Sequence, residues 1–159
     1  MYIYVTNKIK KMKSKYYNPL AGIIILLLTI SCKIEPQAIE YGKDQCSFCV
    51  MNIVDKTHAA QYVTKKGKQF KFDAIECLVN DITEKGEGDL AFILVANYEN
   101  PGQMIDAISA SYLISAEIKS PMGANLSAVS TIEKAEELKE KHTGEIFTWE
   151  LLKQRLSDK

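Results

Sequence analysis

The sequence predicts an α+β protein with a single domain of two similar β-β-α-β units, which follows an N-terminal lipoprotein signal peptide. Three observations support this prediction. A basic N-terminus precedes a short apolar run. The remaining chain alternates between strand-like and helix-like hydrophobic patterns, and two short stretches of it resemble each other.

The N-terminal segment has the features of an export signal that is removed. Five lysines precede the apolar run LAGIIILLLTI at Leu20–Ile30. A helix needs about 20 residues to cross a bilayer, so this run fits the hydrophobic region of a signal peptide. The following Ser31 and Cys32 resemble a lipobox, which predicts cleavage after residue 31, lipid attachment at Cys32 and a membrane-anchored location on the periplasmic side of a bacterial membrane. The alternative is ordinary secretion with Cys32 as a free thiol.

The chain without residues 1–31 has the size and charge of one acidic domain. Of the 159 residues 128 remain, and because the removed segment holds five lysines and no acid, 15 basic residues face 20 acidic ones. An acidic protein without basic clusters is a poor nucleic-acid binder, and no such partner is expected. Polar residues 32–44 read as the lipid anchor and tether, which leaves the folded domain at residues 45–159.

The first half of this domain reads as a hairpin, a helix and a strand. Strands are predicted at about 59–64 and 69–72, on either side of the polar turn KKGK. Apolar residues at helical spacing then predict a helix with Asp73 as its N-cap and its end near Gly86. The run LAFILVANY at residues 90–98 is continuously apolar and rich in β-branched residues, which is typical of a central strand.

The second half repeats a similar order of elements. A strand, a turn around residues 121–123 and a further strand or loop come first. A strongly amphipathic helix follows, with Thr131 as its cap and Gly144 as its stop. A short strand at residues 145–149 and a helix over residues 150–156 end the chain.

An internal similarity supports the two-unit architecture. The stretch GKQFKFDAIEC at Gly67–Cys77 resembles GEIFTWELLKQ at Gly144–Gln154, since both have glycine, aromatic residues, an acid and then a helix. A methionine lies upstream of each stretch, Met51 in one case and Met122 in the other. A duplicated β-β-α-β unit would place the two methionine turns in comparable positions.

The run Cys46-x-x-Cys49-x-Met51 carries the chemistry of the chain. Haem attachment is excluded because Val50 stands where that motif needs histidine. A thioredoxin-like dithiol expects the pair at the start of a helix, whereas here strands follow. Structural zinc requires four nitrogen or sulfur ligands, and the sequence lacks a second pair of closely spaced ligands.

A soft metal fits the run better. Thiolate and thioether sulfurs together favour Cu(I) over zinc or calcium. Cys49 and Met51 point the same way if the segment is extended, because side chains alternate along a strand. Met122 in the tight turn SPMG can supply a third sulfur, and Cys46 can assist. We therefore interpret these residues as a Cu(I) site.

Other interpretations of the same residues stay open. Cys46 and Cys49 can form a disulfide in an oxidising compartment. Methionines such as Met51 and Met122 more often fill gaps in a core than bind metals. Cys77 lies on an apolar helix face and reads as core, and His58 reads as a surface or hairpin residue.

The combination of lipobox, CSFCVMNIVD followed by HAAQ, GKQFKFDAIECL and SPMG resembles the NosL family over residues 41–156. This family consists of copper lipoproteins of nitrous-oxide reductase maturation in denitrification. The resemblance implies two β-β-α-β units and a Cu(I) chaperone that hands copper to apo nitrous-oxide reductase through an ABC-type maturation complex. It also implies that Cys49, Met51 and Met122 are the ligands, with Cys46 assisting.

The sequence departs from that family at Val50, where glycine is common, and at His58, where an aromatic residue is common. No nucleophile–base pair, phosphate loop or pair of catalytic carboxylates indicates an enzyme. The alternative function is a thiol-disulfide oxidoreductase lipoprotein that uses Cys46 and Cys49. A metal-free lipoprotein adaptor, with these cysteines as a structural staple, is a third possibility.

Overall fold

The computed structural model describes residues 33–158, and the residues from Ile34 onward belong to one compact unit. The expected signal peptide and the lipid-bearing Cys32 lie outside the described residues. Within the described part of the chain, no helix combines the length and apolar character that crossing a membrane requires.

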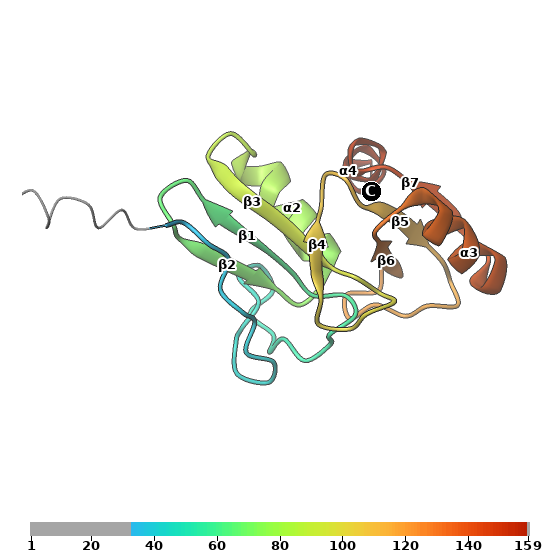
Figure 1. Ribbon diagram of the computed structural model, residues 1–159, viewed down its shortest axis with the longest axis horizontal. Coiled ribbons are helices and arrows are strands. Elements are labelled where there is room, and N and C mark those ends of the chain that lie inside the picture. The colour runs from blue at the N-terminus through green and yellow to red at the C-terminus, as the bar shows by residue number, and fades with distance from the viewer. Residues whose placement is uncertain (1–32, 159) are drawn as a thin grey trace, which may run out of the picture. The chain divides into compact units, whose positions relative to one another are not determined.

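The first β-sheet belongs to the N-terminal half and has four strands in the order β2-β1-β3-β4 (Figure 1). Neighbouring strands in it are antiparallel. Helix α2 packs against β1 and β2. The elements are β1 at Ala60–Thr64, β2 at Gln69–Phe72, α2 at Ile75–Lys85, β3 at Leu90–Ala96 and β4 at Met104–Asp106.

The second sheet has three antiparallel strands in the order β6-β5-β7. Helix α3 packs against it, and α4 contacts both this sheet and α2. The elements are β5 at Ser111–Ile114, β6 at Leu126–Val129, α3 at Ile132–His142, β7 at Glu145–Phe147 and α4 at Trp149–Ser157.

The two halves share one topology, as the sequence predicted. In each half the first strand is central and is flanked by the second strand and by the strand that follows the helix. However, the equivalent elements of the two halves are not those that the internal sequence similarity suggested. That similarity paired β2–α2 with β7–α4. The topology pairs β2–α2 with β6–α3, so that Ile75 and Glu76 correspond to Ile132 and Glu133.

The methionine turns are therefore not equivalent, contrary to the sequence-based expectation. Met51 precedes β1, whereas Met122 lies in the connection between β5 and β6. In the first unit the equivalent connection is the tight turn between β1 and β2. The similarity of the two aromatic-rich stretches reflects their common strand–helix pattern rather than equivalent positions in the units.

The predicted hairpin, helices and strands are present, with two differences. The edge strand β4 was not predicted. Asp73 does not cap α2, because Ala74 is the N-cap residue and no side chain caps it. Asp73 instead accepts the backbone N–H of Val54. Thr131 caps α3 as expected, since its side chain accepts the N–H of Lys134.

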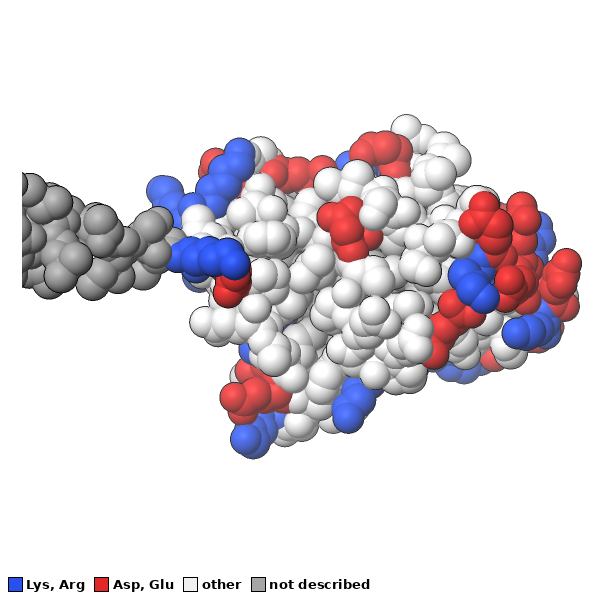
Figure 2. Space-filling view, viewed as in Figure 1, with Lys and Arg blue, Asp and Glu red and all other residues white. Residues whose placement is uncertain are grey.

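Both sheets contribute to a common hydrophobic core. Its largest fully buried side chains include Phe72 and Leu78 from the first unit and Tyr112 and Trp149 from the second. Charged side chains gather instead over α3, while the middle of the face in Figure 2 is mostly uncharged. Because the two units share one core, residues of the second unit can be held rigidly beside the N-terminal end of α2.

Residues 34–44, which read as a tether, are attached to the domain by hydrogen bonds. The Gln69 side chain accepts the N–H of Gln37 and donates to the carbonyl of Glu35. Lys71 donates to the carbonyl of Ala38 and forms an ion pair with Asp44. The segment thus runs along β2 and leads directly into the cysteine motif.

Candidate metal centre

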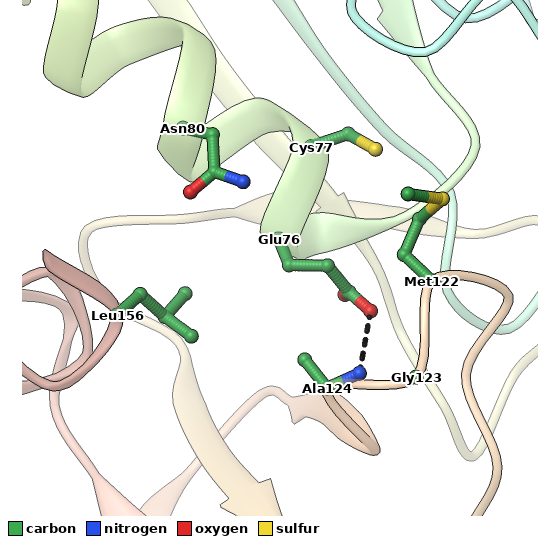
Figure 3. A pocket seen from close by; sticks show the side chains of 7 residues that line it. All are labelled: Glu76, Cys77, Asn80, Met122, Gly123, Ala124 and Leu156. Carbon is green, nitrogen blue, oxygen red and sulfur yellow. Dashed lines mark hydrogen bonds between the residues drawn. The ribbon is translucent and has the colours of Figure 1, made fainter. Parts of the chain in front are cut away.

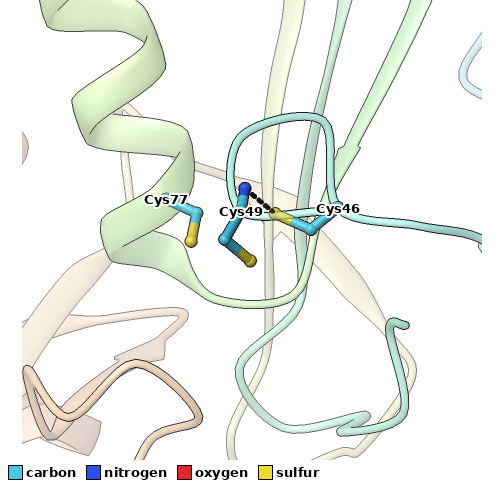
Figure 4. Close-up of side chains that lie close together, drawn as sticks. All are labelled: Cys46, Cys49 and Cys77. Atoms are coloured by element: carbon cyan, nitrogen blue, oxygen red, sulfur yellow. Dashed lines mark hydrogen bonds between the residues drawn. The ribbon is translucent and has the colours of Figure 1, made fainter. Parts of the chain in front are cut away.

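Three cysteine sulfurs lie together at the start of α2. The Sγ atoms of Cys46, Cys49 and Cys77 are all within 4.8 Å of one another (Figure 4). Two of them come from the turn before β1 and the third from the first turn of α2. All three are free thiols rather than disulfides. Cys46 is 2 % exposed and Cys77 is 1 % exposed, while Cys49 is half-buried.

Backbone hydrogen bonds shape the turn that carries Cys46 and Cys49. The N–H of Val50 donates to the carbonyl of Cys46 at 3.0 Å, and the N–H of Cys46 donates to the carbonyl of Met51 at 2.8 Å. The N–H of Ser47 donates to a carbonyl of β2, which fixes the turn against the first sheet. The two cysteines are therefore held in place by the backbone.

The expectation that Cys49 and Met51 point the same way from an extended segment is wrong. Val50 between them has a φ of 65°, which is the left-handed region, so the chain turns there. The backbone N–H of Met51 donates to the Cys49 sulfur. The Met51 side chain is 44 % exposed. The Met51 side chain thus lies at the surface, whereas Cys46 of the same segment is buried.

The environment of Cys46 stabilises a thiolate. A hydrogen bond from the Cys77 thiol is the largest cause, and it lowers the pKa of Cys46 to about 4. Burial opposes this shift, but backbone N–H groups of Cys49, Asp73 and Phe48 also donate to the sulfur. Several N–H groups that donate to one atom stabilise a negative charge on it.

The other two sulfurs favour the protonated state. Hydrogen bonding to Cys46, followed by burial, raises the pKa of Cys77. Burial raises the pKa of Cys49, and the neighbouring Cys46 adds to the effect. The surroundings therefore favour the thiolate form at Cys46 and the protonated form at Cys49 and Cys77.

The spacing of the sulfurs suits one metal ion. A metal bonded at about 2.3 Å to three coplanar sulfurs would hold them about 4 Å apart. The separations below 4.8 Å are compatible with that geometry after a small closure. Soft thiolate ligands select Cu(I), zinc or iron–sulfur centres rather than magnesium or calcium.

Two buried carboxyl groups lie beside the cluster. Glu76 is 5 % exposed and Asp73 is also buried. Each has one oxygen, Oε2 and Oδ1 respectively, without a hydrogen-bond partner among residues 33–158. Burial raises the pKa of Asp73, and the nearby Cys46 contributes. Orphaned buried oxygens are costly, and a bound cation would offset part of that cost.

Met122 lies in the connection between β5 and β6, close to Cys77. It lines a cavity of about 270 Å³ together with Glu76, Cys77 and Asn80. In Figure 3 the Cys77 thiol points toward the Met122 side chain. Met122 is 43 % exposed, so the thioether is reachable from solvent while its neighbour Cys77 is not.

The structure therefore brings some of the predicted site residues together and adds a cysteine that was not among them. Cys46 and Cys49 lie together as expected, but their third partner is Cys77, which the sequence placed in the core. Only the fold reveals this, because Cys77 carries no motif of its own. His58 is not a surface residue: it is 3 % exposed and contacts Asp55 and Ser127.

Fold and site together define a mixed α/β protein with a candidate soft-metal centre. A family model for NosL matches residues 36–157, which is most of the chain. The protein belongs to the NosL family.

A solved structure supports the same fold. The crystal structure of the copper chaperone NosL from Shewanella denitrificans aligns with a TM-score of 0.65 and 19 % sequence identity, and the match covers 75 % of this chain and 96 % of that one. No curated protein sequence matches the chain.

Proposed function

We propose that this protein is a Cu(I) chaperone that carries one copper ion on Cys46, Cys49 and Cys77. The observation that carries the proposal is the set of three sulfurs within 4.8 Å of one another. The related Shewanella protein is described as a copper chaperone, and carriage rather than catalysis fits the site.

The charge of the site favours Cu(I) over Zn²⁺. Cu(I) carries a single charge, so fewer thiolates are needed to balance it than Zn²⁺ requires. Zinc requires more anionic or imidazole ligands to compensate for its lost hydration. The described residues supply no histidine to the cluster, since His58 is engaged by Asp55 and Ser127.

The two methionines would serve copper exchange. A chaperone must release its metal, and buried thiolates alone would hold it too firmly. Met51 and Met122 are neutral, partly exposed donors. A thioether can bind the ion as one cysteine sulfur dissociates from it. The metal can then move to the surface while it stays bound to sulfur ligands.

Delivery and location complete the proposal. The recipient is apo nitrous-oxide reductase, served through an ABC-type maturation complex, as the family resemblance implies. The protein is anchored to a bacterial membrane through a lipid on Cys32 and works on the extracytoplasmic side. Because residues 34–44 run along β2, such an anchor would keep the copper site close to the membrane.

Metal binding by the reduced full chain tests the copper proposal. The protein, purified under reducing and anaerobic conditions, should bind one Cu(I) per chain in competition with a chromogenic chelator. Serine variants of Cys46, Cys49 and Cys77 should each lose most of this affinity. Zinc bound as tightly as Cu(I), or unchanged affinity in all three variants, would contradict the proposal.

A thiol-disulfide oxidoreductase is the second candidate. The lowered pKa of Cys46 favours it, because thiolates are the attacking species in disulfide exchange. The burial of that sulfur counts against it, since a substrate disulfide cannot reach Cys46. Disulfide-reduction assays separate the candidates: Cys77→Ser should leave an oxidoreductase active but should impair a copper carrier.

Replacement of Cys32 tests the anchor separately. Cys32→Ser should release the protein from membranes or leave the precursor uncleaved, because no thiol remains for the lipid. Cu(I) affinity should be unchanged, since the proposed ligands are Cys46, Cys49 and Cys77. Membrane association of the serine variant equal to that of the native chain would rule the lipid anchor out.

A further inference from the structure

The Met122 turn is a tight β-turn with its methionine near the tip. The N–H of Gly123 donates to the carbonyl of Ser120 at 3.1 Å, which closes the turn. Pro121 occupies the second position, and Gly123 has a φ of 80° that favours glycine. The turn leaves the Met122 side chain on the outside, so the turn alone does not fix where its sulfur lies.

A single carboxylate oxygen of Glu76 binds both ends of this turn. Its Oε1 accepts the Ser120 hydroxyl at 2.6 Å. It also accepts the N–H of Ala124 at 3.2 Å (Figure 3). The Ser120 oxygen in turn accepts the N–H of Asn125 at 2.9 Å. The residues on either side of Met122 are thus clamped to one buried side chain.

Glu76 also stands next to the buried thiol in the sequence. It precedes Cys77 in the first turn of α2, where the helix dipole favours a negative charge. Since both residues belong to one rigid helix, the clamp fixes the Met122 turn relative to the Cys77 sulfur. The clamp therefore fixes the backbone on both sides of Met122 relative to α2, and so limits where its thioether can lie.

Stability alone gives a weak reason for this arrangement. A buried carboxylate loses hydration, and the partnerless Oε2 adds to that cost. An apolar side chain would fill the same space without it. Glu133, at the equivalent position of α3, is exposed and makes no such clamp.

We propose that Glu76 is a positioning residue, which holds Met122 where its thioether can take Cu(I) from the cysteine cluster. This inference rests on the proposed copper function and adds a residue to it. Glu76 acts through Met122 and is not itself a ligand. The carboxylate does so by accepting hydrogen bonds, so a neutral amide oxygen in the same place should substitute for it.

The test compares Cu(I) binding by Glu76→Ala, Glu76→Gln, Met122→Leu and the double variant Glu76→Ala/Met122→Leu in the full chain. Glu76→Ala should weaken Cu(I) binding about tenfold, as loss of an outer-shell partner commonly does. Glu76→Gln should restore most of the affinity. In the Met122→Leu background, Glu76→Ala should have no further effect, because the residue it positions is gone.

A spectroscopic readout separates positioning from general destabilisation. The NMR signal of the Met122 methyl group should shift on Cu(I) addition in the native chain and in Glu76→Gln, but not in Glu76→Ala. Glu133→Ala is the matched control and should behave like the native chain. If Glu76→Ala fails to fold, Ser120→Ala removes one arm of the clamp and should give a partial loss.

The outcomes distinguish this inference from the copper proposal. Cu(I) binding that Met122→Leu weakens but Glu76→Ala does not would overturn the positioning role and leave the copper proposal intact. A Glu76→Gln variant as weak as Glu76→Ala would overturn it in favour of a role for the charge. If Met122→Leu has no effect while the cysteine variants lose copper, the clamp has no ligand to position and the inference fails alone.

Discussion

The Cys77 sulfur lies within 4.8 Å of the Cys46 sulfur, which brings the first turn of α2 against the cysteine turn before β1. The N–H of Cys49 donates to the same Cys46 sulfur, and the surroundings of this sulfur lower the pKa of Cys46. The sequence motif gave Cys46 only an assisting role. In the proposed copper site, Cys46 would be the thiol that loses its proton most readily, with Cys49 and Cys77 as its partners.

Replacement of Cys77 should separate its metal role from its packing role. Cys77→Ser should lower Cu(I) affinity by more than the roughly 10–100-fold typical of outer-shell partners, because a ligand is lost. Competition titration against a Cu(I) chelator measures this. The free energy of unfolding without metal is the control. A loss of stability with unchanged Cu(I) affinity would show that Cys77 only packs in the core.

Val50→Gly should raise the free energy of unfolding by up to about 1 kcal/mol. The left-handed conformation costs a non-glycine residue roughly 1–2 kcal/mol, and glycine avoids this cost. Part of the gain is lost because the unfolded chain has more conformational freedom with glycine. Urea unfolding of the metal-free protein measures the change. Val54→Gly is the control, because Val54 is exposed in the same segment and does not have a positive φ. Equal destabilisation by both substitutions would mean that the turn is not strained.

Gly144→Ala should be strongly destabilising. A Cβ at this position would lie 2.4 Å from the carbonyl oxygen of Ile114, and its φ of 121° is unfavourable for alanine. We expect a loss of about 2–4 kcal/mol, as for other strained or overpacked sites. Gly88→Ala should have little effect on thermal unfolding, since a Cβ there meets nothing within 4 Å. Similar melting temperatures for the two variants would contradict the prediction.

The stabilising effect of Asp55 should depend on pH. Burial disfavours its charged form, but hydrogen bonds from Thr57 and His58 outweigh burial and lower the pKa of Asp55. A carboxylate with a lowered pKa stabilises the fold above its unfolded value of 3.8, and this contribution disappears as the pH falls through the folded pKa.

Asp55→Asn should therefore cost about 1 kcal/mol at pH 7, the typical worth of a hydrogen bond. The difference from the native chain should shrink below pH 4. Chemical unfolding at pH 7 and pH 3 measures it, with Glu84→Gln on the exposed face of α2 as the control. A difference that stays constant between the two pH values would show that ionisation of Asp55 is irrelevant to folding.

Local patterns were sufficient to predict most of the fold. The hairpin around KKGK, the Thr131 cap and the apolar run of β3 depend on neighbouring residues, and all three appear as expected. The short edge strand β4 carries too few residues for a periodic signal. The predicted Asp73 cap is absent because the Asp73 side chain accepts the N–H of Val54 instead, a contact between segments distant in sequence.

The site was predictable only where it is local. Cys46 and Cys49 belong to a recognisable motif, so their proximity followed from spacing. Cys77 and Glu76 reach the site through packing of α2, which spacing does not encode. The left-handed Val50 also escaped prediction, because valine rarely adopts that conformation and the sequence gives no sign of it.

The clamp between Glu76 and Ala124 joins residues 48 positions apart, so it forms only when the second unit has folded against α2. A chain that has formed only its first unit has its cysteines but lacks the Met122 turn, so it cannot pass copper on. If Met122 binds copper together with the thiols, the ion would join both units and would stabilise the finished chain by mass action. The proposed copper exchange would then depend on completion of the fold.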